Sequence, residues 1–510
     1  MNEDIKTQDS AKPDKLSTRN LVMFSLGTFG RDFVYGLFAF QLLNYILFTK
    51  QITQAQFGSI TLIIIASRIF DAFNDPIMGG IVDNTRSSWG KFKPWQLIGA
   101  VLTGGVIIAT FSNNLQGGSF IWLLAIMYFM FSITFTMNDI SYWGMMPSLT
   151  SNEHDRSKLM AAAQLVASTG GGLVGIIVPA FTIGALAISG SAVVGYRVVA
   201  IVAVIIMVGF QMFTILGVKE KSIDKILMPQ QKVTLKQIFT KIAKNDQLMW
   251  SSVIMIIFSV GTGIVGGGLS TAYIFFEFGY TGLLLSLFFF FFGVASILFT
   301  VTYPWLEKKF TRTKMFYSTG FAIVIGYLLM LIIGLSIPSS TQYSSLWYTK
   351  FGLMALANGL VGYGHGFYMI MVISMANTVE YNQLKTGKRE EGLVFSLRPF
   401  TAKLSSAIVQ GVVTIVYLLA GVLNYTNKIS ALENDAAREI ISPDAKLAQI
   451  DVIISNVPYI SKTILLVSMC LIPAICLCIS MIIYKKKYIL DEKTFAKILI
   501  EIEERKRGNR

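Results

Sequence analysis

The chain has 510 residues, of which 53% are hydrophobic and 14% are charged, and its formal net charge is +14. Apolar runs of about 20 residues recur along it, which is the length that crosses a bilayer as a helix, so we expect a polytopic membrane protein rather than a soluble domain. The basic residues lie in loops between these runs, which makes nucleic acid a poor explanation for the charge. No Walker loop, Ser/His/Asp set or metal-binding cluster of His and Cys is visible, so we expect neither an enzyme nor a bound cofactor.

The apolar runs predict an all-α fold with twelve transmembrane helices. In chain order the predicted spans are 20–46, 57–83, 94–113, 119–147, 158–186, 194–217, 248–278, 281–306, 314–336, 347–379, 394–425 and 459–485. Lys and Arg are dense in the loops after the second, sixth, eighth and tenth spans, the alternate loops are almost bare, and the long loop 426–458 is mixed. By the positive-inside rule this alternation places both termini of a multi-pass plasma-membrane protein in the cytoplasm.

The longest charged loop follows the sixth predicted span and divides the chain into two halves. The expected organisation is a cytoplasmic tail (1–19), a six-helix bundle (20–217), a cytoplasmic central loop (218–247), a second six-helix bundle (248–485) and a cytoplasmic tail (486–510). Six spans plus six is the layout of the major facilitator fold, in which the substrate site lies near the membrane midplane between the halves.

The second predicted span contains an unusual group of acids, within the stretch Arg68-Ile-Phe-Asp-Ala-Phe-Asn-Asp-Pro76. Each charge near the bilayer centre costs about 2.5–3.5 kcal/mol on insertion scales. Asp71 and Asp75 are four residues apart and therefore share a helix face, with Asn74 beside them. Such hard oxygen ligands suit a small cation or a proton. The alternative is that both acids pair with basic residues of other helices and only hold the bundle together.

Spans one and four carry further polar groups. Asp32 follows Arg31 in span one, where it faces the bundle interior, a water-filled cavity or a partner such as Arg31 itself or Lys403. In span four, Thr136 shares a helix face with Asp139 and Trp143. A carboxylate one turn from an indole suits a sugar, because the acid accepts hydrogen bonds from hydroxyls and the ring stacks on the apolar face of a pyranose. A purely packing role for the tryptophan is the alternative.

The last third of the chain adds a cation and an aromatic ring. Lys403 lies deep in span eleven and has Asp32, Asp71, Asp75 and Asp139 as possible partners. Binding of a sodium ion or a proton to those carboxylates would free the lysine to pair elsewhere, which would act as a switch. Tyr368 in span ten forms either a second aromatic wall of a sugar site or part of the core.

One long stretch resembles a known family. The sequence Arg68-Ile-Phe-Asp-Ala-Phe-Asn-Asp-Pro-Ile-Met-Gly-Gly, followed by Arg86-Ser-Ser-Trp-Gly-Lys-Phe-Lys-Pro-Trp95, is similar to the signature of the glycoside–pentoside–hexuronide:cation symporters, the family of the melibiose permease. Supporting matches are Gly30-Arg-Asp-Phe33, Thr136-Met-Asn-Asp-Ile-Ser-Tyr-Trp143, Glu380-Tyr381 and Lys403. The resemblance covers most of the chain and implies a major facilitator fold.

The resemblance also implies roles for individual residues. The family's cation site corresponds to Asp71, Asn74, Asp75 and Thr136, with Asp71 and Asp75 as candidate sodium ligands, and its charge-linking lysine corresponds to Lys403. Its sugar contacts correspond to Arg31, Asp32, Asp139 and Trp143, and Tyr368 stands for the family's tryptophan in span ten. Three positions depart from the melibiose permease pattern: Gln164 stands for an arginine, Phe135 for a tyrosine, and Arg398-Pro399 for a glutamine–threonine pair. Arg398 either binds a hexuronide carboxylate or lines the cytoplasmic exit.

These observations lead to a functional expectation. We expect a secondary active transporter that co-imports a glycoside or oligosaccharide with sodium or a proton by alternating access. Its expected partners are the sugar, the monovalent cation and the lipid bilayer, and a monomer is assumed because the sequence leaves the oligomeric state open. The neutral oxygens of Asn74 and Thr136 favour sodium, because a proton does not need them. The alternatives are a symporter of the same fold for a hexuronide or a lysolipid, a transporter-like sensor, and a membrane-embedded enzyme.

Overall fold

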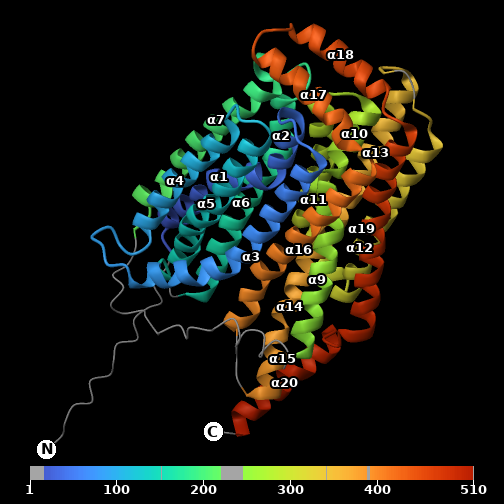
Figure 1. Ribbon diagram of the computed structural model, residues 1–510. Coiled ribbons are helices and arrows are strands. Elements are labelled where there is room, and N and C mark those ends of the chain that lie inside the picture. The colour runs from blue at the N-terminus through green and yellow to red at the C-terminus, as the bar shows by residue number, and fades with distance from the viewer. Residues whose placement is uncertain (1–15, 151, 220–244, 340–341, 388–390, 509–510) are drawn as a thin grey trace, which may run out of the picture.

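The computed structural model describes residues 16–150, 152–219, 245–339, 342–387 and 391–508 (Figure 1). Most of the predicted N-terminal tail and central loop therefore lies outside the described residues. The first half of the chain forms these helices: α1 (Thr18–Gly36), η1 (Leu37–Gln41), α2 (Leu42–Thr49), α3 (Gln54–Asn84), α4 (Lys93–Phe111), α5 (Gly117–Met145), η2 (Met146–Ser148), α6 (Glu153–Thr182), η3 (Ile188–Gly190), α7 (Ala192–Met212) and η4 (Phe213–Gly217).

The second half of the chain is also helical. Its helices are α9 (Asp246–Ile264), η6 (Val265–Leu269), α10 (Ser270–Phe278), α11 (Gly282–Lys309), α12 (Arg312–Ser336), α13 (Ser345–Gly364), α14 (Gly366–Ala376), α15 (Thr378–Thr386), α16 (Glu391–Leu419), α17 (Val422–Ala437), α18 (Pro443–Ser455), α19 (Tyr459–Lys487) and α20 (Glu492–Gly508). Figure 1 shows the halves as two bundles lying side by side, with α17 and α18 across one end and α15 and α20 at the other.

Local sequence fixes where many of these helices begin. A hydroxyl or carboxamide oxygen of the residue before the helix accepts a hydrogen bond from an otherwise unpaired main-chain N–H of the first turn. Ser17, Thr53, Ser191, Asn245, Thr311 and Ser442 cap α1, α3, α7, α9, α12 and α18 in this way. The helix starts predicted from the apolar runs fall within about five residues of the observed ones.

The number of spans agrees with the prediction. Among the described residues, eleven helical spans are long and apolar enough to cross a membrane, and α3 makes twelve if its two bent segments form one span. Those segments, Gln54–Asp71 and Phe73–Asn84, are inclined by 40°. Pro76 explains a bend at this point, because proline lacks the N–H that would bond to the carbonyl four residues earlier and its ring collides with that carbonyl. The bend therefore lies within the Asp71–Asp75 turn.

The end of span eleven differs from the prediction. The sequence predicts a span that reaches residue 425 and a loop over 426–458, whereas α16 ends at Leu419 and two further helices, α17 and α18, follow as a hairpin. Gly421 makes the break, since its positive φ of 64° is a conformation that favours glycine. The hairpin is amphipathic rather than apolar, so a scan of mean hydropathy does not detect its helices.

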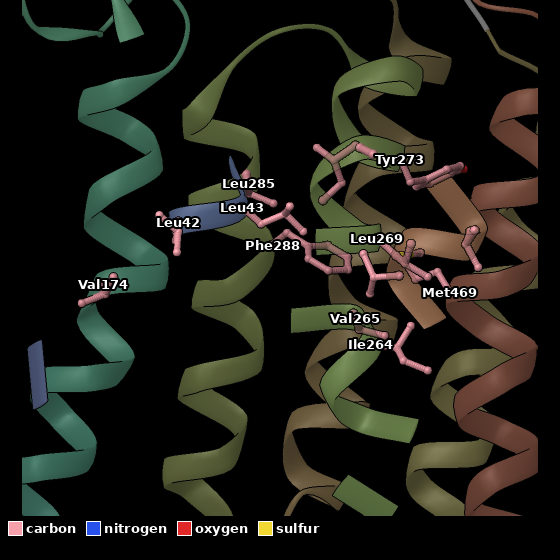
Figure 2. Close-up of a cluster of buried hydrophobic side chains, with 14 of the residues drawn as sticks. Leu42, Leu43, Val174, Ile264, Val265, Leu269, Tyr273, Leu285, Phe288 and Met469 are labelled. Atoms are coloured by element: carbon pink, nitrogen blue, oxygen red, sulfur yellow. The ribbon is translucent and has the colours of Figure 1, made fainter. Parts of the chain in front are cut away.

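The two halves meet along helix pairs and share one hydrophobic core. α3 packs on α16, α6 on α11, and α2 on α17. Figure 2 shows part of the shared core, in which Leu42 and Leu43 of the first half lie with Leu285 and Phe288 of the second. Leu43 approaches Gly268 so closely that a Cβ there would lie 3.0 Å from its Cδ2 atom. Because α3 packs on α16, the polar residues Asp71, Asp75 and Lys403 lie on helices that meet between the halves.

Candidate functional site

An ion pair between the halves involves the carboxylate of Asp75. The Nζ of Lys403, on α16, is in hydrogen-bond contact with Asp75 Oδ2. The other carboxylate oxygen accepts a hydrogen bond of 3.1 Å from the hydroxyl of Thr136 on α5. The carboxylate is about one-third exposed, whereas most of the lysine side chain is covered. Of the four acids that the sequence left open as partners of Lys403, the structure brings Asp75 into direct contact.

The carboxylate of Asp71 has its own cation and its own hydroxyl. Arg68 lies 3.6 Å from it, one turn earlier on α3, and Ser132 of α5 donates a hydrogen bond to its Oδ1. Lys403 Nζ is 4.0 Å from the other oxygen. Asn74 donates from its side-chain amide to the main-chain oxygen of Ser132, at 3.2 Å. Two acids are thus balanced by two cations, and the predicted members of the cation site lie together.

Ser132 and Arg68 also belong to this cluster, although the sequence pattern predicts no role for either of them. Arg68 stands in the quoted motif, and its guanidinium lies over the ring of Tyr128 at 5.8 Å. Ser132 gives no signal by itself in an apolar helix. It precedes Thr136 by four residues, however, as Asp71 precedes Asp75, so the two hydroxyls and the two acids repeat with the same helical spacing.

A second polar cluster surrounds Arg31 on α1. Its guanidinium contacts Asp32 Oδ2 through Nη2 at 2.6 Å and through Nε at 3.0 Å, and its Nη1 lies 3.0 Å from Asp139 Oδ1 on α5. Thr28 donates a further hydrogen bond to Asp32, at 3.1 Å. Arg31 is 2% exposed, whereas the Asp139 side chain is 41% exposed. The arginine is therefore the buried support of the cluster, and Asp139 is its accessible face.

Aromatic rings complete this second cluster. The Arg31 guanidinium lies 4.7 Å from the ring centroid of Tyr142 and 5.1 Å from that of Trp143. Tyr142 is itself fixed, because it stacks on Phe24 and its hydroxyl donates to the Phe24 carbonyl. Trp143 is half-buried and perpendicular to Tyr142. Arg31 therefore contacts both Asp139 and the ring of Trp143.

Helix α5 carries groups of both clusters. Ser132, Thr136, Asp139 and Trp143 follow at helical spacing along one face. Thr136, which contacts Asp75, is separated from Asp139, which contacts Arg31, by about 5 Å of helix rise. The same helix therefore contributes groups to both clusters, Thr136 to the first and Asp139 to the second.

Three further residues, Tyr368, Gln164 and Arg398, are predicted contacts of the sugar. The ring of Tyr368, on α14, lies among aromatic neighbours, with centroids 6.1 Å from His365 and 6.3 Å from Phe258. Gln164, on α6, is exposed and bonds to Ser168 one turn later, at 3.4 Å. Arg398 belongs to α16, and its side chain lies outside those that the structure describes. Their proposed contacts with a sugar stay predictions.

The fold is that of known secondary transporters. The chain superimposes on a crystal structure of a D-xylose–proton symporter with a TM-score of 0.57 at 13% identity, covering 86% of this chain and 98% of that one. It superimposes on the inward-open xylose transporter of Escherichia coli with a TM-score of 0.58 at 12% identity, covering 94% and 98%. At these identities the likeness shows the fold, and the predicted major facilitator architecture is confirmed.

The family follows from the sequence comparison. Residues 23–486 match the model of the MFS/sugar transport protein family, so the chain belongs to that family. It is a multi-pass membrane protein and a sugar transporter of the major facilitator superfamily, and the predicted kinship with glycoside–pentoside–hexuronide:cation symporters is confirmed. This family consists of transporters rather than enzymes.

Curated relatives are similar over most of the chain. The raffinose carrier protein of Pediococcus pentosaceus is 29% identical over 94% of this chain and 71% of its own length. The lactose permease of Leuconostoc lactis is 26% identical over 79% and 62%, and the Escherichia coli glucuronide carrier protein homolog is 25% identical over 80% and 85%. The chain thus spans less than two thirds of that lactose permease, which extends beyond the matched region.

Proposed function

We propose that this transporter couples the import of a neutral glycoside or oligosaccharide to the entry of a monovalent cation. The observation that carries the proposal is the pair between Lys403 and Asp75, because it joins α16 of the second half to α3 of the first. A cation that binds the carboxylate competes with the lysine for it. Loading of the ion would therefore loosen one contact between the halves, which is what coupled alternating access requires.

The ion site is proposed to consist of Asp71, Asn74, Asp75 and Thr136. The Thr136 hydroxyl already contacts Asp75, so an ion at that carboxylate would find a neutral oxygen next to the charged one. Sodium is the proposed ion, because hard cations favour such oxygen ligands whereas a proton needs only the carboxylate. One charge crossing about 100 mV supplies roughly 2.3 kcal/mol, which supports about 40-fold accumulation of the sugar.

The sugar site is proposed to lie at Asp139 and Trp143. Asp139 is the exposed acid of its cluster, and Arg31 behind it orients both acids. This cluster has one cation and two carboxylates, so its net charge of about −1 favours neutral hydroxyl groups and disfavours a substrate carboxylate. Disaccharides and trisaccharides such as lactose and raffinose, the sugars that name two relatives, are the first candidates.

A hexuronide is the second candidate substrate. The glucuronide carrier protein homolog among the relatives favours it, and Arg398 is the proposed partner of the carboxylate. Uptake of radiolabelled lactose, raffinose and a phenyl glucuronide into proteoliposomes distinguishes the two proposals. Accumulation of the neutral sugars in a sodium gradient supports the first proposal, and accumulation of the glucuronide alone would replace it with the second.

The orientation of the protein is proposed from its charges. Lys93 donates to the carbonyl of Val218, where the central loop begins, and Arg312 donates to the carbonyl of Leu490, just before α20. The basic loop between α3 and α4 therefore lies beside the start of the central loop, and the basic loop between α11 and α12 lies at the end of the molecule that carries α20. We assign this end to the cytoplasm and the end with α17 and α18 to the outside of the plasma membrane.

A further inference from the structure

The helical hairpin α17–α18 connects the two halves at the outer end of the molecule. The hairpin belongs to the second half, because α18 packs on α10 and α17 packs on α18, but α17 also packs on α2 and α7 of the first half. Figure 1 shows α17 and α18 lying across this end. It therefore has the position of a strap between two bodies that must separate here if a sugar enters from this side.

A buried ion pair forms the centre of this contact. Glu433 of α17 and Lys446 of α18 have fully buried side chains, and Lys446 Nζ lies 3.0 Å from Glu433 Oε1. Glu433 Oε2 accepts a hydrogen bond of 2.6 Å from the N–H of Ala192, the first residue of α7, and Lys446 donates one of 2.7 Å to the Gly190 carbonyl. A carboxylate at a helix N-terminus is favourable, and its burial is offset only while these partners stay in place.

Two asparagines of α17 extend the contact to other segments of the first half. Asn427 bonds to Ile52 twice, accepting from its N–H at 3.0 Å and donating to its carbonyl at 2.8 Å. Asn434 donates to the Thr49 carbonyl at 2.9 Å and accepts from Gln116 at 3.2 Å. The hairpin therefore contacts the first half at three places: the end of α2, the start of α5 and the start of α7.

Glycines allow the halves to approach so closely. Gly190 has a positive φ of 66°, and a Cβ on it would lie 2.4 Å from Pro443 Cγ of α18. A Cβ on Gly282, whose N–H bonds to the Ile183 carbonyl across the interface, would lie 1.7 Å from the Pro179 oxygen. Real Cβ atoms do not approach other atoms at such distances, so larger residues at these positions would push the halves apart.

We infer that the α17–α18 hairpin is a clasp that holds the outer end of the transporter closed and must release the first half for the outer end to open. The clasp consists of the contacts made by Asn427, Glu433, Asn434 and Lys446. It would set the balance between outward-facing and inward-facing states, and this role rests on the alternating access proposed above. The bound sugar and ion would act on this balance from the interior, through the α3–α16 pair.

The clasp can be tested by measuring one distance in the full chain. Spin labels at Leu186 and Gln449, which are exposed residues of the first half and of α18, report the separation by double electron–electron resonance in nanodiscs. The three cysteines, all in α19, are first replaced by alanine. Asn427→Ala should increase the ratio of separated to closed molecules about tenfold, equivalent to about 1.4 kcal/mol. Asn424→Ala, an exposed asparagine of the same helix, is the matched control and should leave the ratio unchanged.

A second variant acts by steric pressure instead of bond removal. Gly190→Ala should also lengthen the measured distance, because its methyl group would meet Pro443. If this variant does not fold, Asn427→Ala combined with Asn434→Ala decides the question. A distance distribution like that of the wild type in the asparagine variants would overturn the clasp. The distance is measured without a gradient and is therefore independent of transport. If the asparagine variants shift the distance but the wild-type chain accumulates no sugar, the proposed function is refuted and the clasp is supported.

Discussion

Asparagine at position 75 removes the negative charge at the centre of the proposed coupling. In the wild-type chain Asp75 binds Lys403 and accepts a hydrogen bond from Thr136. The variant keeps an oxygen for Thr136 but has no charge to attract either the lysine or an ion. We expect Asp75→Asn to abolish concentrative uptake while the sugar still binds and equilibrates, because Asp139 and Trp143 are unaltered.

The structure indicates that this variant should fold. Lys403 would keep a carboxylate partner, since its Nζ lies 4.0 Å from Asp71 Oδ2. Two unit charges at this distance attract each other by about 4 kcal/mol at an effective dielectric constant near 20. The lysine is therefore expected to move onto Asp71 rather than to stay buried without a partner. The driving force of about 2.3 kcal/mol per charge is lost, so accumulation should fall from about 40-fold to equality.

Paired assays on one proteoliposome preparation separate these effects. Uptake of labelled lactose and raffinose in a sodium gradient at about −100 mV measures accumulation, and counterflow of the same sugars without a gradient measures binding and translocation. We expect Asp75→Asn to lose accumulation and to retain counterflow. Concentrative uptake by Asp75→Asn at the wild-type level would refute the assignment of the ion site. If the variant loses counterflow and is also poorly expressed in the cell membrane, the cause is a folding defect.

Three further variants test the remaining groups. Asp139→Asn should remove sugar binding in isothermal calorimetry, and an affinity near that of the wild type would contradict its role. Arg31→Lys should weaken sugar binding about tenfold, because a lysine cannot make the two hydrogen bonds to Asp32, while the sodium dependence stays unchanged. Ser132→Ala should raise half-saturating sodium about fivefold, the equivalent of about 1 kcal/mol for one lost hydrogen bond to Asp71, with unaltered sugar affinity. An unchanged sodium dependence would exclude Ser132 from the ion site.

The parts of the site that lie on one helix were predictable from the sequence. Asp71 and Asp75 share a face of α3 because they are four residues apart, and Thr136, Asp139 and Trp143 share a face of α5 for the same kind of reason. The costs of burying charge also indicated that these acids have partners. These inferences need only the helical period and the chemistry of the side chains.

Contacts between helices were not fixed by the sequence. Lys403 had four candidate acids, and only the packing of α16 on α3 selects Asp75. Ser132 was missed because a lone serine in an apolar helix has no distinctive signal until Asp71 is placed against it. The structure shows Asp32 paired with Arg31, which was one of the alternatives. Arg31 also contacts Asp139, so one guanidinium holds both acids.

Mean hydropathy predicts a loop where the structure has the hairpin α17–α18, because apolar and polar residues are mixed in this segment. Its buried positions, Val422, Ile429, Glu433 and Ala436 among them, nevertheless recur at helical spacing. A search for amphipathic periodicity in the segment 426–458 would have found it, whereas a hydropathy scan does not. Its docking on the first half depends on tertiary contacts with Gly190, Ala192 and Ile52 and had no signal in the sequence.

Simultaneous measurement of sugar and ion flux shows whether the protein couples the two. Proteoliposomes containing the wild-type protein receive lactose or raffinose on one side, and the entry of labelled sugar and of labelled sodium is followed in parallel. We expect the sugar to drive sodium inward in a fixed ratio near one to one, and Asp75→Asn to uncouple the two fluxes. Sugar uptake in the wild type with no accompanying flux of sodium or of protons would contradict this coupling.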